Sequence, residues 1–164
     1  MRILVLSDSH SGLSFAKRCV QAIRPDTLIH LGDYYEDGQA LHQSFPKIPF
    51  YQVPGNCDRG RTPLDVPEIL ISNLAGADVY MTHGHLHGVK SGNGKLLAAA
   101  RASGCAAVLY GHTHQSECYQ EDSGLWVLNP GTCGMYGGSA GLMEIRDGRV
   151  VSCRVIHEYD LLGI

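Results

Sequence analysis

Four short apolar runs in the chain stop abruptly at small or turn-forming residues. The runs cover residues 2–6, 27–31, 49–53 and 106–110, and they are closed by Ser7, Gly32, Pro54 and Gly111 respectively. An apolar run of four to eight residues that is bounded by turn signals is typical of a buried strand. The pattern therefore predicts four buried strands.

Helical patterns lie between these strands. Over residues 11–22 the apolar side chains recur on one stripe, and Pro25 ends the pattern. Residues 37–44 are compatible with a second, short helix. Residues 93–103 are rich in Leu and Ala, which are strong helix formers, and Gly104 is well placed to cap a helix there.

The other segments predict strands that follow one another without helices. Residues 69–74 and 78–81 are expected to form a hairpin. Further strands are expected at residues 117–121, 125–128, 141–145 and 150–156, with Asp147-Gly148 as the turn between the last two. The order predicts an α/β fold with an antiparallel finish, in a single domain over residues 1–164.

Composition and charge narrow the class of protein. The chain has 164 residues, of which 44% are hydrophobic, so one domain with a substantial core is expected. The net charge is -3 and no basic run occurs, so no nucleic-acid-binding surface is evident. No apolar stretch approaches the roughly 18 residues that span a membrane, and no signal peptide is visible. The six cysteines form no Cys-x-x-Cys pair, which favours reduced thiols and a cytoplasmic location.

Side chains that bind metals follow five of the predicted strands, each at the point where the strand ends. They are Asp8, His10, Asp33, Asn56, His83, His112 and His114. Successive groups are separated by about one βα unit, and sites in α/β sheets form beyond the carboxyl ends of strands. We therefore expect all seven side chains to converge at one end of the sheet.

The residue types in this set indicate a metal site. The Asp-x-His, Gly-Asp and Gly-Asn groups taken alone are more often turns or helix caps, and Gly-His-x-His alone is as often a turn as a metal site, but five groups at matching positions are hard to explain in that way. Imidazole and carboxylate donors suit manganese, zinc, iron, nickel or cobalt. Seven donors exceed the needs of one tetrahedral ion but fit two ions that share a bridging carboxylate. Two ions roughly 3.5–4 Å apart activate a bridging water and stabilise in-line displacement at phosphorus.

The chain resembles the calcineurin-like metallophosphoesterases, and among them the small single-domain phosphodiesterases of bacteria and archaea. The resemblance extends over nearly the whole chain and rests on motifs that occur in order. They are Asp8-Ser9-His10, Gly32-Asp33, Gly55-Asn56-Cys57-Asp58, His83-Gly84-His85, Gly111-His112-Thr113-His114 and Asn129-Pro130-Gly131. It implies a four-layer α/β/β/α sandwich with two facing mixed sheets.

The resemblance also implies a cofactor and its ligands. Asp8, His10 and His114 would hold one divalent ion, while Asn56, His83 and His112 would hold the other, with Asp33 as the bridge. Manganese is the usual ion in such enzymes, and nickel, iron or zinc also fit. The residues expected to act in catalysis are Asp33, Asn56 and His85.

The chain departs from the larger members of the family at Cys57, where they carry a histidine that protonates or stabilises the leaving oxygen. Losing a general acid can cost roughly 10²–10⁴ in rate, so we expect substrates with good leaving groups or another acid. His85 is the candidate acid, and a residue that only hydrogen-bonds to the ligands is an equal alternative.

Other positions near the predicted site have two interpretations each. Arg59 and Arg61 could meet a substrate phosphate or simply lie in a solvated loop. A glycine-rich loop over residues 131–141, which contains Tyr136, could line the pocket or be a plain turn. His30 lies within a strand and is expected to be a hydrogen-bonded core residue.

Three functions are compatible with these predictions. The first is hydrolysis of a small phosphate ester, diester or monoester, by attack of a hydroxide that bridges the two ions. The second is a non-catalytic scaffold of the same fold that binds other proteins, and the third is a regulatory metal-binding domain. The complete set of seven ligand-type residues favours the enzyme. The natural substrate and the oligomeric state remain open at this stage.

Overall fold

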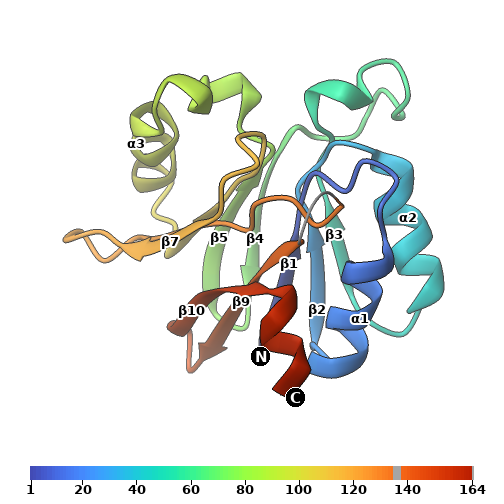
Figure 1. The fold of residues 1–164 in the computed structure, drawn as a ribbon. Helices are drawn as coiled ribbons and strands as arrows, with labels where there is room; N and C mark the ends of the chain where they lie inside the picture. Colours follow the sequence, from blue (N-terminus) through green and yellow to red (C-terminus); the bar gives the residue numbers. More distant parts are fainter. Residues whose placement is uncertain (135–137, 164) are drawn as a thin grey trace.

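Two five-stranded mixed sheets form the centre of the protein, in a computed structural model that describes residues 1–134 and 138–163 (Figure 1). The first sheet has the strand order β10-β9-β1-β2-β3, and the second has the order β4-β5-β6-β8-β7. The strands of the first sheet are β1 (Arg2–Leu6), β2 (Thr27–His30), β3 (Phe50–Gln52), β9 (Ser139–Arg146) and β10 (Arg149–His157). Those of the second are β4 (Ile69–Leu74), β5 (Ala77–Thr82), β6 (Ala107–Leu109), β7 (Glu117–Gln120) and β8 (Trp126–Asn129).

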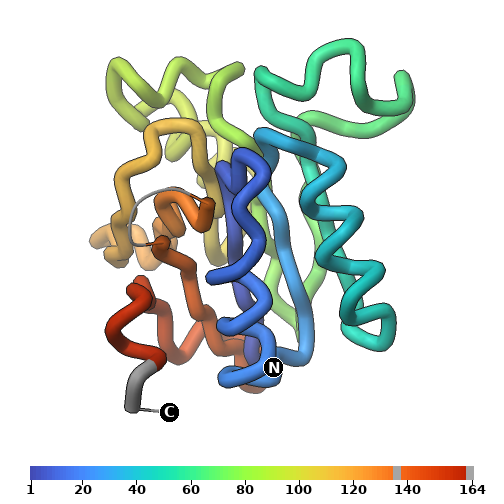
Figure 2. Tube along the Cα trace, turned by 45° about the vertical axis from the view of Figure 1, so that its right-hand side comes forward, coloured from blue at the N-terminus to red at the C-terminus, as the bar shows by residue number. Residues whose placement is uncertain are grey.

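Helices cover the outer face of each sheet. Helices α1 (Ser14–Ile23) and α2 (Tyr35–Ser44) lie against the first sheet, and α3 (Gly94–Ala102) lies against the second, on the opposite side of the molecule (Figures 1 and 2). The protein is therefore the α/β/β/α sandwich of two facing mixed sheets that the family resemblance implied.

Three separate apolar clusters hold the four layers together. Side chains of β1 contribute to two of these clusters, because successive residues of a strand point to opposite faces. Ile3 and Val5 pack in the cluster between the two sheets, whereas Leu4 and Leu6 pack against α1 and α2. A third cluster joins α3 to the outer face of the second sheet. All four of these β1 side chains are fully buried, which explains the uninterrupted apolar run in the sequence.

Strand direction brings the ends of the strands to one edge. Strands β1, β2 and β3 pair in parallel, as do β5, β6 and β8. The loops that follow β1, β2 and β3 therefore leave the first sheet on the same side. The loops after β5 and β6 leave the second sheet on the corresponding side.

The helix expected over residues 11–22 begins later, at Ser14. The reason lies in the preceding loop, where His10 and Ser11 adopt left-handed backbone conformations that no helix can include. The other helices and the strands agree with the prediction to within a few residues. Short 3₁₀ helices, which include η1 (Asn56–Asp58), η2 (His85–His87), η3 (Val89–Ser91) and η4 (Glu158–Gly163), have no counterpart in the apolar pattern.

The strands of the antiparallel finish divide between the two sheets. β7 and β8 extend the second sheet, while β9 pairs with β1 and places β10 at the edge of the first. The Asp147-Gly148 turn joins β9 and β10, and both of its residues have positive φ, 49° and 72°. This is the geometry of a tight hairpin turn, as the sequence predicts.

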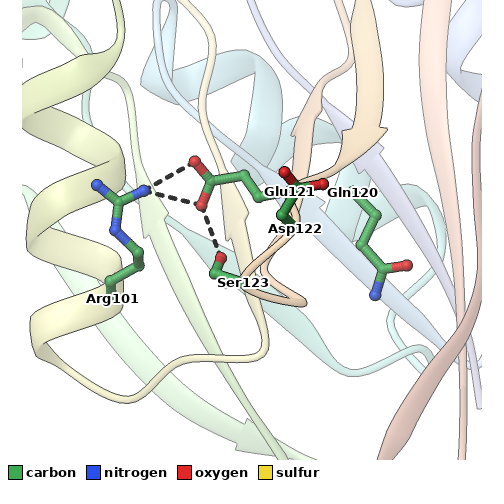
Figure 3. Close-up of a pocket in the computed structure, with 5 residues that line it drawn as sticks. All are labelled: Arg101, Gln120, Glu121, Asp122 and Ser123. Atoms are coloured by element: carbon green, nitrogen blue, oxygen red, sulfur yellow. Dashed lines mark hydrogen bonds and ion pairs between the residues drawn. The ribbon is translucent and has the colours of Figure 1, made fainter.

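The surface hollow beside the end of α3 lies away from every predicted site residue. Its lining residues are Arg101, Gln120, Glu121, Asp122 and Ser123 (Figure 3). Arg101 Nη1 donates to both oxygens of Glu121, at 2.7 and 2.8 Å, and so ties the helix to the turn between β7 and β8. Among the described residues, no helix is long and apolar enough to cross a membrane.

Candidate metal centre

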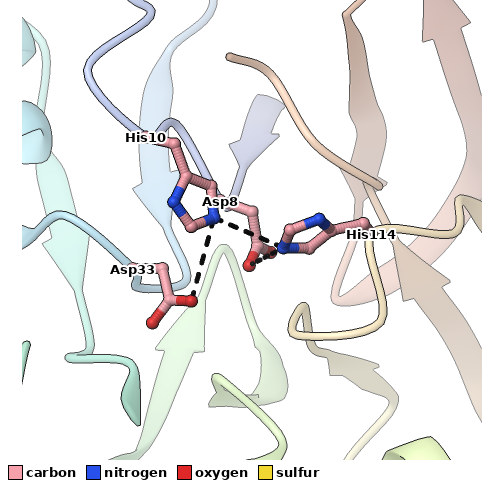
Figure 4. Close-up of side chains that lie close together, drawn as sticks. All are labelled: Asp8, His10, Asp33 and His114. Carbon is pink, nitrogen blue, oxygen red and sulfur yellow. Dashed lines mark hydrogen bonds and ion pairs between the residues drawn. The ribbon is translucent and has the colours of Figure 1, made fainter. Parts of the chain in front are cut away.

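The structure brings the seven predicted metal ligands to one end of the two sheets. Four of them, Asp8, His10, Asp33 and His114, each offer a ligand atom within 4.8 Å of the others (Figure 4). A second group with the same spacing contains Asp33, His83 and His112. Asp33 belongs to both groups, which is the arrangement expected of a carboxylate that bridges two ions.

The first group is built from three loops. His114 Nε2 lies 3.1 Å from Asp8 Oδ1 and 3.3 Å from His10 Nε2. His10 Nε2 lies 3.9 Å from Asp33 Oδ2, so the four side chains face a common centre (Figure 4). Two imidazole nitrogens and two carboxylates on one centre form a suitable donor set for a divalent transition metal.

The second group is built around His83, whose side chain is fully buried. Its Nε2 atom lies 3.2 Å from Asn56 Oδ1, 3.2 Å from His112 Nδ1 and 3.4 Å from Asp33 Oδ1. Its other nitrogen, Nδ1, lies 2.8 Å from the carbonyl oxygen of Leu31 and must donate a proton to it. This hydrogen bond fixes the tautomer and leaves the Nε2 lone pair free to bind a metal.

Asp8 provides a test of whether a cation fits the first group. Its Oδ2 atom accepts hydrogen bonds from Ser7 Oγ at 2.6 Å and from the His112 amide at 3.1 Å. Its Oδ1 atom is buried and accepts no hydrogen bond from the described residues, although His114 Nε2 lies 3.1 Å away. A buried carboxylate oxygen without a donor is costly, and a cation at the centre of the group would satisfy it. The donor set and this oxygen both fit a divalent ion.

The electrostatics of the site favour the forms of the side chains that bind metals. Burial raises the pKa of Asp33, but the electrostatic effect of His83 and the hydrogen bond from the Cys57 amide outweigh it, so the pKa is lowered overall and the carboxylate stays ionised. Burial lowers the pKa of His112 to about 4, and the nearby His83 and Lys90 act in the same direction. His112 is therefore a neutral imidazole at pH 7, as coordination requires.

Most of the ligands sit on strained backbone. Positive φ angles occur at Asp8, His10, Asp33, His112 and His114, with values between 43° and 69°. A residue with a side chain pays about 1–3 kcal/mol for such a conformation, and strain of this kind concentrates at functional sites. The surrounding structure must therefore impose these conformations on the loops.

Two glycines let the ligand loops approach the buried carboxylates closely. A Cβ atom on Gly111 would lie 2.0 Å from Ser7 Oγ and 2.7 Å from Asp8 Oδ2. A Cβ atom on Gly55 would lie 2.1 Å from Asp33 Oδ1. Only glycine fits at either position, which explains why a glycine precedes both Asn56 and His112.

Two further polar side chains hold ligand loops without facing the metal centre, and the sequence motifs that contain them gave no hint of this role. Asn129 is fully buried, and its Nδ2 atom donates to the Gly111 carbonyl at 3.2 Å and to Thr113 Oγ1 at 2.9 Å. Asp58 is buried and accepts from the amides of Gly55 and Tyr35, both at 2.7 Å. The first clamps the loop of His112 and His114, and the second joins the loop of Asn56 to the start of α2.

His85 lies at the rim of the site rather than within either group of ligands. Its ring centre is 5.5 Å from that of His83 and 6.1 Å from that of His112. Its Nε2 atom is 3.5 Å from Glu68 Oε1, and its side chain remains 17% exposed. Burial and the neighbouring His83 lower the pKa of His85, while Glu68 opposes them. His85 therefore borders the second ligand group without belonging to it.

Of the remaining predicted positions that the structure describes, three are exposed and one is buried. Cys57 is exposed, and its amide donates to Asp33 Oδ1 at 3.0 Å. Arg59 and Arg61 are exposed on the loop after η1. His30 is fully buried with hydrogen-bond partners on both ring nitrogens, which confirms the predicted core role. Tyr136 lies outside the described residues.

Solved structures share this fold over nearly the whole chain. A structure of an archaeal phosphodiesterase matches with a TM-score of 0.74 at 23% identity, covering 96% of this chain and 99% of that one. Vacuolar protein sorting 29 from Cryptosporidium parvum matches with a TM-score of 0.73 at 17% identity, covering 95% and 96%. At these identities the likeness establishes the fold alone.

Sequence comparison goes further. A probable metallophosphoesterase of Bacillus subtilis, YsnB, is 32% identical over 140 residues, which are 80% of this chain and 75% of that protein. The phosphodiesterase MJ0936 of Methanocaldococcus jannaschii is 26% identical over 147 residues, or 81% of this chain and 84% of that protein. The family model of the calcineurin-like phosphoesterase superfamily domain matches residues 1–148. With its motifs on the loops that this fold brings together, the chain belongs to the calcineurin-like phosphoesterase superfamily.

Proposed function

We propose that the protein is a phosphodiesterase that hydrolyses a small phosphate ester with the help of two divalent metal ions. The observation that carries the proposal is the sharing of Asp33 between two groups of ligand atoms, each within 4.8 Å. One carboxylate between two such groups is the arrangement that a pair of ions requires. Membership of a metal-dependent phosphoesterase family and the name of the Methanocaldococcus relative support the same reaction class.

Each group of side chains has a defined task in this proposal. Asp8, His10 and His114 would hold one ion, while Asn56, His83 and His112 would hold the other. The bound ions would supply an activated water as nucleophile and offset the negative charge that develops on the phosphate. Asp33 fixes the distance between the two positions, and its ionised state is maintained by the Cys57 amide and His83.

Protonation of the leaving oxygen is the task that we assign to His85. The side chain is partly exposed, it borders both His83 and His112, and its Nε2 atom lies 3.5 Å from Glu68 Oε1. Cys57 stands where larger relatives have a histidine. Its pKa is raised, chiefly by partial burial and then by the neighbouring Asp33 carboxylate. A thiol of raised pKa is a poor proton donor, so esters with good leaving groups should react fastest.

Turnover with a model diester tests the proposal directly. The purified protein is stripped with a chelator, and hydrolysis of bis-p-nitrophenyl phosphate is followed before and after Mn²⁺ is restored. We expect activity only with the metal, and a loss of at least about 10²-fold in Asp33→Ala and His112→Ala. Wild-type rates no higher than those of the two variants at saturating Mn²⁺ would refute the enzyme.

The number and identity of the ions need a separate measurement. Metal analysis after loading should return about two ions per chain in the wild type and fewer in Asp33→Ala. Parallel loading with Ni²⁺, Fe²⁺ and Zn²⁺ ranks the candidates, with Mn²⁺ expected to give the highest turnover. One ion or none in the wild type would contradict the binuclear site.

A protein-binding scaffold is the second candidate function. The likeness to vacuolar protein sorting 29 favours it, because that name describes a sorting protein rather than an enzyme. The complete ligand groups argue against it here, since a scaffold has no need of seven donors, five of them on strained backbone. Failure of the protein to bind metal, combined with the absence of turnover, would favour the scaffold.

A further inference from the structure

We infer that a hydrogen-bond chain from the buried His30 and Ser9 to the half-buried Asp37 holds the ligand loops after β1 and β2 in place, which makes these three positioning residues of the metal centre. The inference rests on the proposed function, because it concerns the same site. None of the three faces either group of ligand atoms. They lie behind the site, between the loops and helix α2.

The chain is continuous across three elements. The Gly32 amide lies 3.3 Å from His30 Nδ1, and His30 Nε2 lies 3.1 Å from Ser9 Oγ. Ser9 Oγ in turn lies 2.7 Å from Asp37 Oδ2, which also accepts from the Ser11 amide at 2.7 Å. These hydrogen bonds join the loop after β1, the end of β2 and the first turn of α2 without a gap.

The donors and acceptors of this hydrogen-bond chain favour one arrangement of protons, because Ser9 Oγ lies 2.7 Å from Asp37 Oδ2 but 3.4 Å from the Asp33 carbonyl oxygen. The Gly32 amide can only donate, so His30 Nδ1 must be the acceptor. The single ring proton then sits on Nε2 and is donated to Ser9 Oγ, whose own hydroxyl proton goes to the Asp37 carboxylate. Every donor finds an acceptor, and a fully satisfied buried network of this kind is rigid. Burial lowers the pKa of His30 to about 4, which keeps the ring in the neutral form that the chain needs.

His30 could instead be a residue that only fills the core, but its surroundings argue against this. Its neighbours on the same face of the first sheet form the apolar cluster beneath α1 and α2. A leucine at position 30 would pack there with no polar group to bury. The Gly32 amide would then lose the partner that His30 Nδ1 provides, and a buried polar group without a partner costs about 1–3 kcal/mol.

The hydrogen-bond chain restrains the part of the site that carries backbone strain. Ser9 lies between Asp8 and His10, whose φ angles are 53° and 43°. Gly32 precedes Asp33, whose φ angle is 56°. The hydrogen-bond chain adds to the bond from the Asp8 amide to the Gly32 carbonyl at 2.9 Å, which joins the same two loops, so its loss should let the ligands of the first group shift.

Affinity for Mn²⁺ tests the inference without relying on turnover. Metal-free protein is titrated with Mn²⁺, and the free ion is followed by its EPR signal. Ser9→Ala and Asp37→Ala should bind Mn²⁺ about 10–100-fold more weakly than the wild type, the range seen when partners of metal ligands are removed. Asp37→Asn keeps an oxygen that can accept both hydrogen bonds, so its affinity should return to within about threefold of wild type.

Matched controls separate positioning from a general loss of stability. Ser44→Ala removes a hydroxyl that bonds the Ala40 carbonyl at 3.0 Å on the exposed face of α2. Ala100→Gly removes a buried methyl group and weakens helix α3 on the other side of the molecule. Thermal unfolding of each metal-free variant identifies those with equal stability. Affinity for Mn²⁺ should be unchanged in both controls.

The outcomes distinguish this inference from the proposed function. If Ser9→Ala and Asp37→Ala bind Mn²⁺ as tightly as the wild type, or no more weakly than Ala100→Gly at equal stability, the positioning role is wrong. If the wild type binds Mn²⁺ but hydrolyses no ester, the proposed function fails while the affinities still decide the inference. Weakened binding in Asp37→Ala that Asp37→Asn restores supports it.

Discussion

At the scale of single residues, the site combines ligand chemistry with unfavourable backbone. His114 shows both properties, since its Nε2 atom meets Asp8 Oδ1 at 3.1 Å while its φ angle is 60°. Its side chain is 39% exposed, so replacing it removes little packing. The strain at this residue can therefore be measured separately from burial.

Comparison of His114→Gly with His114→Ala isolates that strain. Glycine adopts a positive φ at little cost, whereas alanine pays about 1 kcal/mol or more. The metal-free His114→Gly protein should therefore be about 1 kcal/mol more stable than His114→Ala in urea unfolding, although both bind Mn²⁺ weakly. The same pair of changes at Arg24, which also has a positive φ of 51° but lies at the end of α1, is the control. Equal stability of the two His114 variants would show that no strain is stored there.

The buried neutral His30 predicts how stability depends on pH. In the folded protein burial lowers its pKa from 6.5 to about 4, with Asp8, Asp37 and Asp58 opposing and His83 assisting. Between these two values the unfolded chain binds a proton that the folded chain does not. The free energy of unfolding of the metal-free protein should therefore decrease as pH falls from about 6.5 to 4. The decrease should be shallower in His30→Gln, and parallel pH profiles for the two proteins would contradict the assignment.

At the scale of elements, the loops of neighbouring strands are fitted to one another by glycine. The loop after β6 runs against the end of β1, where Gly111 packs on Ser7 and Asp8 with no room for a side chain. The loop after β3 meets the one after β2 in the same way, through Gly55 and Asp33. Contacts between elements therefore set the spacing of the two ligand groups.

Gly111→Ala tests this fit. The added Cβ atom would fall 2.7 Å from Asp8 Oδ2, so the loop must shift and carry His112 and His114 with it. We expect a loss of at least about tenfold in Mn²⁺ affinity and a lower Tm. Gly94→Ala is the matched control, because a Cβ atom there meets nothing within 4 Å and alanine favours the helix. Unchanged affinity in Gly111→Ala would mean that the loop adjusts without disturbing its ligands.

At the scale of the whole molecule, the cluster between the two sheets couples both halves of the site. Ligand loops leave both sheets, so the two ligand groups are aligned only while the sheets stay packed. Met143 and Leu128 are fully buried in that cluster, on β9 and β8. We therefore propose that residues 1–164 fold as one cooperative domain.

Cooperativity can be checked by unfolding the protein with two probes. Far-ultraviolet circular dichroism reports on both sheets, and the fluorescence of Trp126, the single tryptophan, reports on β8. The two transitions should coincide. Leu128→Ala should lower the free energy of unfolding by about 2–5 kcal/mol in both signals. Transitions that separate would divide the chain into independently stable parts.

Much of this protein follows from its sequence, because its signals are local. Buried strands such as β1 need apolar side chains on both faces, so Ile3–Leu6 stand out as an uninterrupted run. The ligands follow these strands directly, so Asp8, Asp33 and His83 could be identified as members of one site by their positions along the chain. The turn at Asp147-Gly148 was predictable for the same reason, since two adjacent residues determine it.

Tertiary structure decided everything that depends on distant segments. Asn129 and Asp37 bond to ligand loops that are far away in sequence, and no local sequence pattern at either residue indicates its hydrogen-bond partners. The division of the last four strands between two sheets depends on which edge each one pairs with, and the apolar pattern of a strand does not encode its neighbour. By itself the sequence determined which residues could bind metal, because that is side-chain chemistry. The grouping of the ligands and the sharing of Asp33 were implied by the family resemblance, but only the packing of the two sheets sets the distances that place Asp33 in both groups, because these distances depend on segments far apart in the sequence.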